Sequence, residues 1–278
     1  MQIRSWTVTI TDMDYSVLMS VYSGEKPEYL RCSIQSILDQ TVPSNDIVIV
    51  CDGPLTDELN EVLTSFADKI RTIRLPDNGG LGNALNKGLG ECLNDIVARM
   101  DSDDIALPDR MAKQLSIFTE DKDIALVSGT VEEFSEDISV IVGRRDVPLS
   151  YEEIKSFSRK RNPMNHPAVM FRKTAVIKAG SYNEDYPYFE DYSLWIRILM
   201  NGERAVNLKD TLVYMRVDEG TFTRRGGVRY ASDMLRFHRY LLRSGWSSVA
   251  DYISGALPHA VVCILPNRLR AMIYKKLH

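Results

Sequence analysis

The sequence predicts an α/β protein built around a mostly parallel sheet. Apolar, strand-like runs alternate with helix-like segments from residue 15 to residue 100. Two of these runs end in an aspartate, Asp52 and Asp101. Strands that alternate with helices form parallel sheets covered on both faces, and such sheets bind ligands beyond the carboxyl ends of their strands. With 278 residues, 44% of them hydrophobic, the chain can bury the core of one continuous domain.

The first β-α-β unit begins at residue 15. YSVLMSVY (15–22) is a strand-like run, apolar residues follow Pro27 at helical spacing over 27–40, and DIVIVCD (46–52) is a second strand. The same alternation continues through a helix, a strand, a helix and a strand, over about 55–66, 69–75, about 80–93 and 95–100.

The alternation stops after Leu149. The second half mixes two helical patterns with two shorter strands, over 151–160, 189–200, 168–172 and 211–217. We expect this half to complete a cleft beside the parallel sheet. A helical tail is predicted from about residue 230.

Composition and charge exclude several classes of protein. The net charge of −4 argues against a nucleic-acid partner, which usually requires a strongly basic face. The four cysteines are widely spaced and form no C-x-x-C pair, so we expect a reduced, cytoplasmic protein without a disulfide framework or zinc site. The N-terminus lacks the apolar core of a signal peptide, and no apolar run approaches the roughly 20 residues that span a bilayer. Any membrane contact is therefore expected to be peripheral.

Three carboxylates, Asp101, Asp103 and Asp104, directly follow the apolar run Ile96–Ala98. Carboxylates this close repel one another unless a cation or hydrogen-bond donors compensate them. Oxygen ligands suit Mg²⁺ or Mn²⁺, with substrate phosphates completing the coordination shell. The triplet alone equally fits an acidic turn before the helix that begins near Pro108.

Six motifs, taken in order, resemble family 2 glycosyltransferases over roughly residues 15–217, and most of all bacterial enzymes that build O-antigen or exopolysaccharide units. The motifs are SVYSGEKPEYLRCSIQSILDQT, IVIVCDG, DNGGLGNALNKGL, ARMDSDDIALPDRM, NHPAVMFRK and FEDYSLWIRIL. The resemblance implies a GT-A fold, a nucleotide-sugar donor, a divalent metal, Mn²⁺ or Mg²⁺, and transfer with inversion at the anomeric carbon.

The resemblance places the donor nucleotide near the ends of the first strands. Asp52 suits the N–H of a uracil, and the ring of Tyr22 suits contact with the base. The glycines after Asn78 allow close approach of the backbone to the nucleotide, with the following helix dipole favouring phosphate, although a simple turn before a helix also explains them. The expected donor-binding residues are Val21, Tyr22, Glu25, Asp52, Asn78, Gly79, Gly80, Asn83 and Asp101.

The resemblance also assigns the chemistry to carboxylates. Asp101 and Asp103 take the metal positions, with Asp103 the stronger candidate for direct ligation and Asp104 behind them. Arg99 either ties down one of these carboxylates or forms a structural salt bridge. Asp191 is the expected base that removes a proton from the acceptor hydroxyl, and Glu190 orients the acceptor. Both acids also suit a role as partners of the helix dipole.

Two further features of the sequence each allow a functional and a structural interpretation. The loop Arg216–Arg229 joins cations to paired glycines, which is typical of a lid over a diphosphate, with Arg224 and Arg225 as clamps, but also of a solvated loop. His166 precedes Pro167 at a strand start, where a histidine is more often a hydrogen-bonded structural residue than a ligand.

The predicted organisation is a catalytic domain over 1–229, with a nucleotide-sugar half over about 15–110 and an acceptor half over about 111–229, followed by a helical extension over 230–278. From Pro266 onward the extension combines an apolar helical face with Arg and Lys. This pattern is typical of an interfacial helix on the inner face of a cell membrane, and equally of a helix packed on the catalytic domain.

The predicted function is an inverting transferase that moves a hexose or N-acetylhexosamine from a UDP-sugar to a glycan acceptor, linked through diphosphate to a lipid, in bacterial surface polysaccharide synthesis. A sugar nucleotidyltransferase is an alternative, although the segment after the first strand, SVYSGEKPEYL, is not its glycine-rich basic loop. A non-catalytic nucleotide-sugar-binding protein is another.

Overall fold

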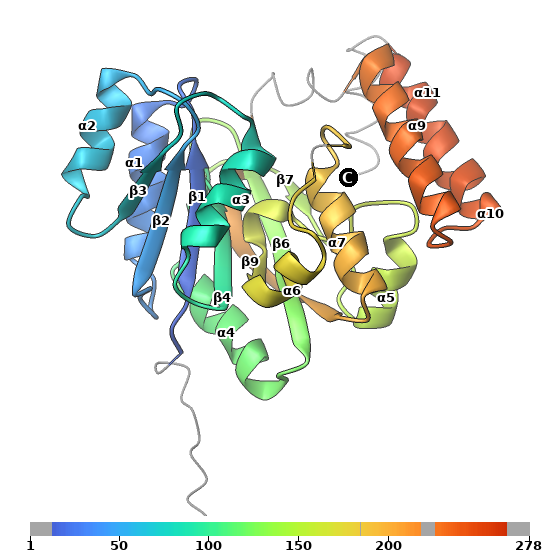
Figure 1. The fold of residues 1–278 in the computed structure, drawn as a ribbon, viewed down its shortest axis with the longest axis horizontal. Coiled ribbons are helices and arrows are strands. Elements are labelled where there is room, and N and C mark those ends of the chain that lie inside the picture. Colours follow the sequence, from blue (N-terminus) through green and yellow to red (C-terminus); the bar gives the residue numbers. More distant parts are fainter. Residues whose placement is uncertain (1–12, 184, 218–225, 266–278) are drawn as a thin grey trace, which may run out of the picture.

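The computed structural model describes residues 13–183, 185–217 and 226–265. Within them lies a nine-stranded sheet of order β3-β2-β1-β4-β8-β6-β9-β5, with β7 paired to β6 (Figure 1). The strands are β1 (Ser16–Val21), β2 (Asp46–Cys51), β3 (Arg71–Arg74), β4 (Ile96–Asp101), β5 (Ile105–Ala106), β6 (Ile124–Phe134), β7 (Ile141–Arg145), β8 (Met170–Arg172) and β9 (Arg204–Arg216).

Helices connect these strands and extend the chain beyond them. They are α1 (Pro27–Leu38), α2 (Asp57–Ser65), α3 (Leu81–Glu91), α4 (Arg110–Glu120), α5 (Tyr151–Phe157), α6 (Lys173–Lys178), α7 (Glu190–Met200), α9 (Val228–Arg243), α10 (Val249–Asp251) and α11 (Leu257–Ile264), with a 3-10 turn, η2 (His166–Ala168), and a π-helical turn, η3 (Tyr252–Ala256). The alternation predicted from the sequence is confirmed from β1 through β4.

The strand directions divide the sheet into two parts. β3, β2, β1 and β4 are parallel neighbours, as predicted. Beyond β4 the sheet is mixed, because β8 runs antiparallel to both β4 and β6, whereas β9 runs parallel to β6. The long strand β6 and its partner β7 were not among the elements predicted from the sequence.

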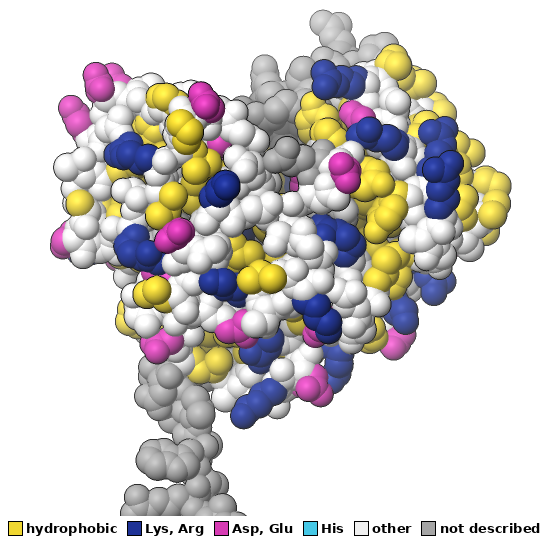
Figure 2. Space-filling view, viewed as in Figure 1, with side chains coloured by type: hydrophobic (Ala, Val, Ile, Leu, Met, Phe, Trp, Pro, Cys, Tyr) yellow, Lys and Arg dark blue, Asp and Glu magenta, His cyan; other side chains and the backbone are white. Residues whose placement is uncertain are grey.

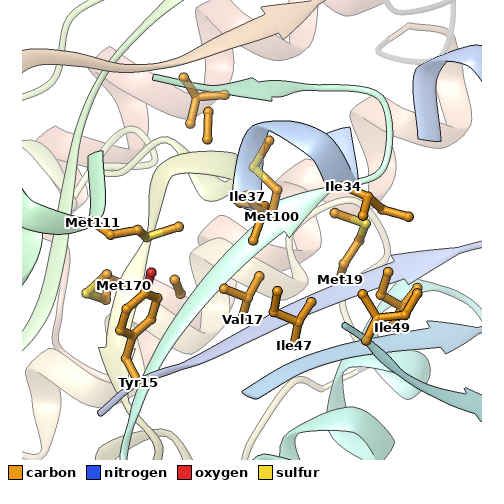
Figure 3. Packing of buried hydrophobic residues seen from close by; sticks show 14 of the residues in the cluster. Tyr15, Val17, Met19, Ile34, Ile37, Ile47, Ile49, Met100, Met111 and Met170 are labelled. Atoms are coloured by element: carbon orange, nitrogen blue, oxygen red, sulfur yellow. The ribbon is translucent and has the colours of Figure 1, made fainter. Parts of the chain in front are cut away.

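The two faces of the sheet bury different helices. On one face, Val17 and Met19 of β1 pack with Ile34 and Ile37 of α1, and with further residues of α2 and α4 (Figure 3). The next residue along β1, Leu18, points to the opposite face and packs with α3, α6 and α7. Side chains of a strand alternate between faces, so the apolar run of β1 supplies both halves of the core.

Gly88 of α3 lies where that helix crosses the sheet. A Cβ at Gly88 would overlap the side chains of Leu18 and Val50, whereas a Cβ at Gly90, on the same helix, meets no atom within 4 Å. Both Gly→Ala changes gain the same helix propensity, about 1 kcal/mol, but only Gly88→Ala overpacks the core, at a cost of about 1–3 kcal/mol. We expect urea denaturation to give the Gly88→Ala variant a free energy of unfolding about 1–3 kcal/mol lower than that of the Gly90→Ala variant. Equal stability of the two variants would contradict this packing.

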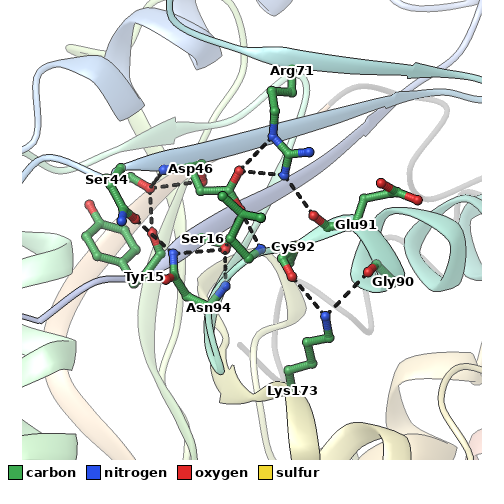
Figure 4. A network of polar contacts seen from close by, with 12 residues as sticks. Tyr15, Ser16, Ser44, Asp46, Arg71, Gly90, Glu91, Cys92, Asn94 and Lys173 are labelled. Carbon is green, nitrogen blue, oxygen red and sulfur yellow. Dashed lines mark hydrogen bonds and ion pairs between the residues drawn. The ribbon is translucent and has the colours of Figure 1, made fainter.

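A polar network closes the edge of the sheet where the parallel strands begin (Figure 4). The buried carboxylate of Asp46 accepts hydrogen bonds from Ser16 Oγ (2.6 Å), Arg71 Nη2 (2.6 Å) and the backbone N–H of Leu93 (2.8 Å). Burial alone would raise the pKa of Asp46, but these donors lower it below its ordinary value. The network joins β1, β2, β3 and the turn before β4.

The helical extension predicted from about residue 230 begins at Val228 and packs on α7. The ring centroid of Phe237 on α9 lies 4.8 Å from that of Tyr192 and 5.3 Å from that of Phe189. Gly227 N–H donates to Cys263 O at 2.9 Å, which ties the start of α9 to α11. The segment 266–278, for which an interfacial helix was one expectation, lies outside the described residues. No helix within the described ranges is long and apolar enough to cross a membrane.

Candidate active site

The carboxyl ends of β1, β2 and β4 bring acidic side chains to one edge of the sheet. These strands are parallel neighbours, so the residues that follow them lie close together. Ser102, after β4, donates through Oγ to Glu25 Oε2, after β1, at 2.5 Å. Ser33 of α1 donates to the carbonyl oxygen of Asp101 at 2.7 Å. The loops after β1 and β4 are thus joined by side-chain hydrogen bonds.

Arg99 holds the carboxylate of Asp101 from within the core. Its guanidinium is 1% exposed and donates to both oxygens of Asp101, with Nη1 at 2.6 Å from Oδ2. A bidentate pair of this kind fixes the carboxylate in orientation as well as in position. The sequence allowed Arg99 either to hold a carboxylate of the acidic motif or to form a structural salt bridge elsewhere. The observed geometry matches the first role.

Asp103 and Asp104 are held by the end of β9. The backbone N–H of Arg216 donates to Asp104 Oδ1 at 2.8 Å, and Arg216 Nε donates to the carbonyl oxygen of Asp103 at 3.2 Å. The Arg216 guanidinium carbon lies 3.7 Å from the ring centroid of Tyr29 and 4.4 Å from that of Phe134. Arg216 was not predicted as a site residue. Its sequence signal was limited to its position as the first cation of the loop after a strand.

The acidic group has the chemistry of a divalent-cation site. Asp101, Asp103 and Asp104 each offer a carboxylate oxygen, and these oxygens lie within 4.8 Å of one another. Burial and the neighbouring charges of Asp101 and Glu25 raise the pKa of Asp103 to about 7. Among the described residues, no hydrogen-bond donor reaches the buried Asp104 Oδ2. Hard oxygen ligands and closely spaced carboxylates fit Mg²⁺ or Mn²⁺.

Asp52 joins the end of β2 to the turn before α3. Its two oxygens accept the backbone N–H groups of Gly79 (2.8 Å) and Gly80 (3.0 Å), so these amides have a partner within the protein. Gly80 adopts φ 86°, which favours glycine, and a Cβ at Gly79 would overlap the amide of Asn83. These contacts explain the glycines as parts of the turn. The predicted contacts of Asp52, Asn78, Gly79, Gly80 and Asn83 with a nucleotide stay predictions.

The loop after β1 supplies the remaining predicted donor residues. Val21 is buried, and its carbonyl oxygen accepts the N–H of Asp52 at 2.8 Å. The ring of Tyr22 is 46% exposed and lies against Gly24, where it would overlap any Cβ. Its exposure leaves Tyr22 available to a ligand at this edge, and a stacking role stays a prediction.

Glu190 and Asp191 form the first turn of α7. Asn162, between α5 and η2, donates through Nδ2 to Asp191 Oδ2 at 2.7 Å. This bond orients the Asp191 carboxylate, and Asn162 was not predicted, because no local pattern links it to a residue 29 positions away. A Cβ at Gly82 would lie 3.9 Å from Glu190 Cγ, so the first turn of α3 lies beside the first turn of α7.

Tyr182 lies between the acidic motif and α7. Burial raises the pKa of the Tyr182 hydroxyl, and the charges of Arg99, Asp191 and Asp101 all act on it. Its hydroxyl is 3.0 Å from His166 Nε2, and burial together with Arg99 lowers the pKa of His166 well below its ordinary value. A half-buried histidine that is held neutral and bound to a tyrosine fits the structural role. The charges of Asp101 and Asp191 both act on Tyr182, so the tertiary structure brings the two groups of carboxylates to one region.

The predicted clamp residues Arg224 and Arg225 lie outside the described residues. Their role over a diphosphate stays a prediction.

Comparisons with known proteins address the fold and the family. The family model described as "Glycosyl transferase family 2" matches residues 16–184. An uncharacterized glycosyltransferase of Haemophilus influenzae is 40% identical over 268 residues, which cover 95% of this chain and 98% of that protein. The UDP-Gal:alpha-D-GlcNAc-diphosphoundecaprenol beta-1,3-galactosyltransferase of Escherichia coli is 38% identical over 267 residues, covering 94% of this chain and 95% of that protein.

Solved structures share the fold at low sequence identity. A mannosyltransferase of Pyrobaculum calidifontis, solved with GDP-Man and Mn²⁺, is 18% identical, with a TM-score of 0.66 over 95% of this chain and 79% of that one. The mixed sheet with its covering helices is a GT-A fold, as expected. Sequence matches along most of the chain agree with this architecture, and the protein belongs to glycosyl transferase family 2.

Proposed function

We propose that this glycosyltransferase moves a hexose or N-acetylhexosamine from a UDP-sugar to a glycan linked through diphosphate to a lipid, at the inner face of a bacterial membrane, during surface polysaccharide synthesis. The similarity to a UDP-galactose-using enzyme along 94% of the chain supports the donor and acceptor classes. The observation that carries the proposal is the approach of Asp101, after β4, and Asp191, on α7, to Tyr182, with Asp101 belonging to a group of carboxylates whose oxygens lie within 4.8 Å of one another.

The donor occupies the edge of the sheet formed by the ends of β1, β2 and β4. A carboxylate has about four acceptor sites, and the hydrogen bonds from Gly79 and Gly80 occupy two of those of Asp52. A remaining site accepts the uracil N–H. Asp101 and Asp103 hold a divalent cation. When bound, that cation supplies positive charge against the diphosphate leaving group. Arg99 keeps Asp101 in one orientation throughout.

The acceptor lies beside the first turn of α7. Asp191, oriented by Asn162, takes the proton of the acceptor hydroxyl as the oxygen bonds to the anomeric carbon, and the nucleoside diphosphate departs from the opposite face. Glu190 contributes a second carboxylate that orients the acceptor. A single displacement inverts the anomeric centre, so an α-linked donor gives a β-linked product.

A donor screen tests the proposed function. We expect purified protein with Mn²⁺ to release UDP from one member of a panel of UDP-sugars, and only when a GlcNAc- or GalNAc-diphosphate-lipid analogue is present. The measurement is coupled detection of UDP, with mass spectrometry of the extended acceptor. Pyrophosphate release from UTP and a sugar phosphate would instead identify a nucleotidyltransferase. Binding of UDP-sugar without any turnover across the panel would identify a non-catalytic protein.

A further inference from the structure

The C-terminal helices present an apolar surface to solvent. Five large apolar side chains, four or three positions apart, share the outer side of the segment from α10 through η3 to α11. Their exposed fractions are 62% for Val249, 55% for Ile253, 41% for Leu257, 57% for Val261 and 54% for Ile264. We call these five residues the apolar stripe. A surface helix normally turns polar residues outward, whereas this segment exposes large apolar side chains.

The other exposed residues along the apolar stripe are uncharged. Between Val249 and Ile264 the other exposed residues are Ala250, Ser254 and Pro258. The carboxylate in this segment, Asp251, accepts hydrogen bonds from the backbone N–H (3.0 Å) and Oγ (2.7 Å) of Ser248 and pairs with Lys160 at 3.4 Å. Contiguous exposed apolar surface of this kind marks an interaction site.

Cations border the apolar stripe on two sides. α9, which packs beside α11, exposes four arginines that we call the arginine band, namely Arg229, Arg236, Arg239 and Arg243. Figure 2 shows basic side chains over α9 next to hydrophobic ones at the outer edge of the molecule. At the η3 end, the exposed residues Arg159, Lys160 and Arg161 line a shallow pocket with Asp251, and a Cβ at Gly255 would lie 3.1 Å from Lys160 Cβ.

We propose that the apolar stripe and the arginine band dock this enzyme on the surface of an anionic phospholipid bilayer. The apolar side chains enter the boundary between head groups and acyl chains, and the arginines pair with lipid phosphates. A membrane-docked enzyme suits the proposed function, on which this inference rests, because its lipid-linked acceptor lies in the same bilayer.

Charge distinguishes the bilayer from two other occupants of this surface. A second copy bound about a two-fold axis that crosses the apolar stripe at right angles would bring the arginine band of one protomer against the same band of the other. The chain's own segment 266–278 contains Arg268, Arg270, Lys275 and Lys276 and no carboxylate, so its charge also repels the arginines. An anionic bilayer complements both the apolar and the basic parts.

Vesicle flotation with full-length protein tests the proposal. We expect the protein to float with vesicles of phosphatidylcholine and phosphatidylglycerol, and less with phosphatidylcholine alone or in high salt. Leu257→Ser/Val261→Ser should lower the apparent affinity for the mixed vesicles at least 10-fold. The matched control is Val140→Ser/Val142→Ser, which changes two valines that are 57% and 56% exposed at the start of β7. Control flotation should equal that of the unmodified protein.

Several results would overturn the docking surface. They are equal flotation of the Leu257→Ser/Val261→Ser variant and the unmodified protein, loss of flotation only when residues 266–278 are removed, or a dimer that dissociates in this variant while no form binds vesicles. UDP release with a short-chain, water-soluble acceptor separates docking from catalysis. Activity without flotation would refute docking alone, whereas flotation without activity on any donor would refute the proposed function alone.

Discussion

Asp191→Asn is expected to lower kcat by about 100-fold or more while leaving the KM for the donor nearly unchanged. The carboxylate stands in the first turn of α7, where Asn162 orients it, and it is the proposed proton acceptor. Asparagine keeps the shape of the side chain and can still accept a hydrogen bond, but it cannot take a proton from the acceptor hydroxyl. Steady-state kinetics with the identified donor measure both constants.

The matched control for this variant is Asp57→Asn. Asp57 is an exposed acid in the first turn of α2, so it has the same relation to its helix dipole but lies in another element. The Asp57→Asn variant should have the kcat of the unmodified protein. If Asp191→Asn also turned over normally, Asp191 would be only a dipole partner of α7. An α-linked product from an α-linked donor would likewise rule out the single displacement.

Asp103→Asn is expected to abolish transfer and to weaken Mn²⁺-dependent binding of UDP. Asp103 lies among Asp101, Asp104 and Glu25, where a divalent cation is the natural compensation for the accumulated negative charge. Loss of one anionic ligand reduces the affinity for the cation, and with it the affinity for diphosphate. Isothermal titration calorimetry with and without Mn²⁺ measures the affinity for UDP independently of turnover.

The control is Asp109→Asn, in the next loop along the chain, between β5 and α4, where Asp109 pairs with Lys113 at 2.8 Å. This variant should bind UDP as the unmodified protein does. Removing metal with a chelator should stop transfer by the unmodified protein, and Mn²⁺ or Mg²⁺ should restore it. Full activity in chelator, or Mn²⁺-dependent UDP binding that persists in Asp103→Asn, would contradict the metal assignment.

Local sequence patterns were sufficient for the parallel half of the fold. The apolar runs of β1, β2 and β4 and the helical spacing of α1 are properties of neighbouring residues, so each element could be predicted from its own segment. The acidic motif after β4 was visible for the same reason, because its three carboxylates lie within four residues. The family resemblance then placed Asp52 and Asp191 in the same site.

The contacts that organise the site come from distant parts of the chain. Asn162 and Asp191 are 29 residues apart, and Arg216 and Asp104 are 112 residues apart. The second half of the sheet depends on similar pairings, since β6 lies between β8 and β9. No local periodicity encodes which donor reaches which carboxylate, because many distant side chains have the same hydrogen-bonding capacity.

The sequence by itself determined that the C-terminal segment is helical and rich in apolar residues, and it determined the acidic motif and the succession of strands and helices in the parallel half. Only the tertiary structure decided which side of α11 is covered. Ala260 and Cys263 pack against α9, which leaves Val261 and Ile264 in solvent. A helix that is apolar on all sides carries no signal for its buried face, so the choice is made by the shape of the surface on which it packs.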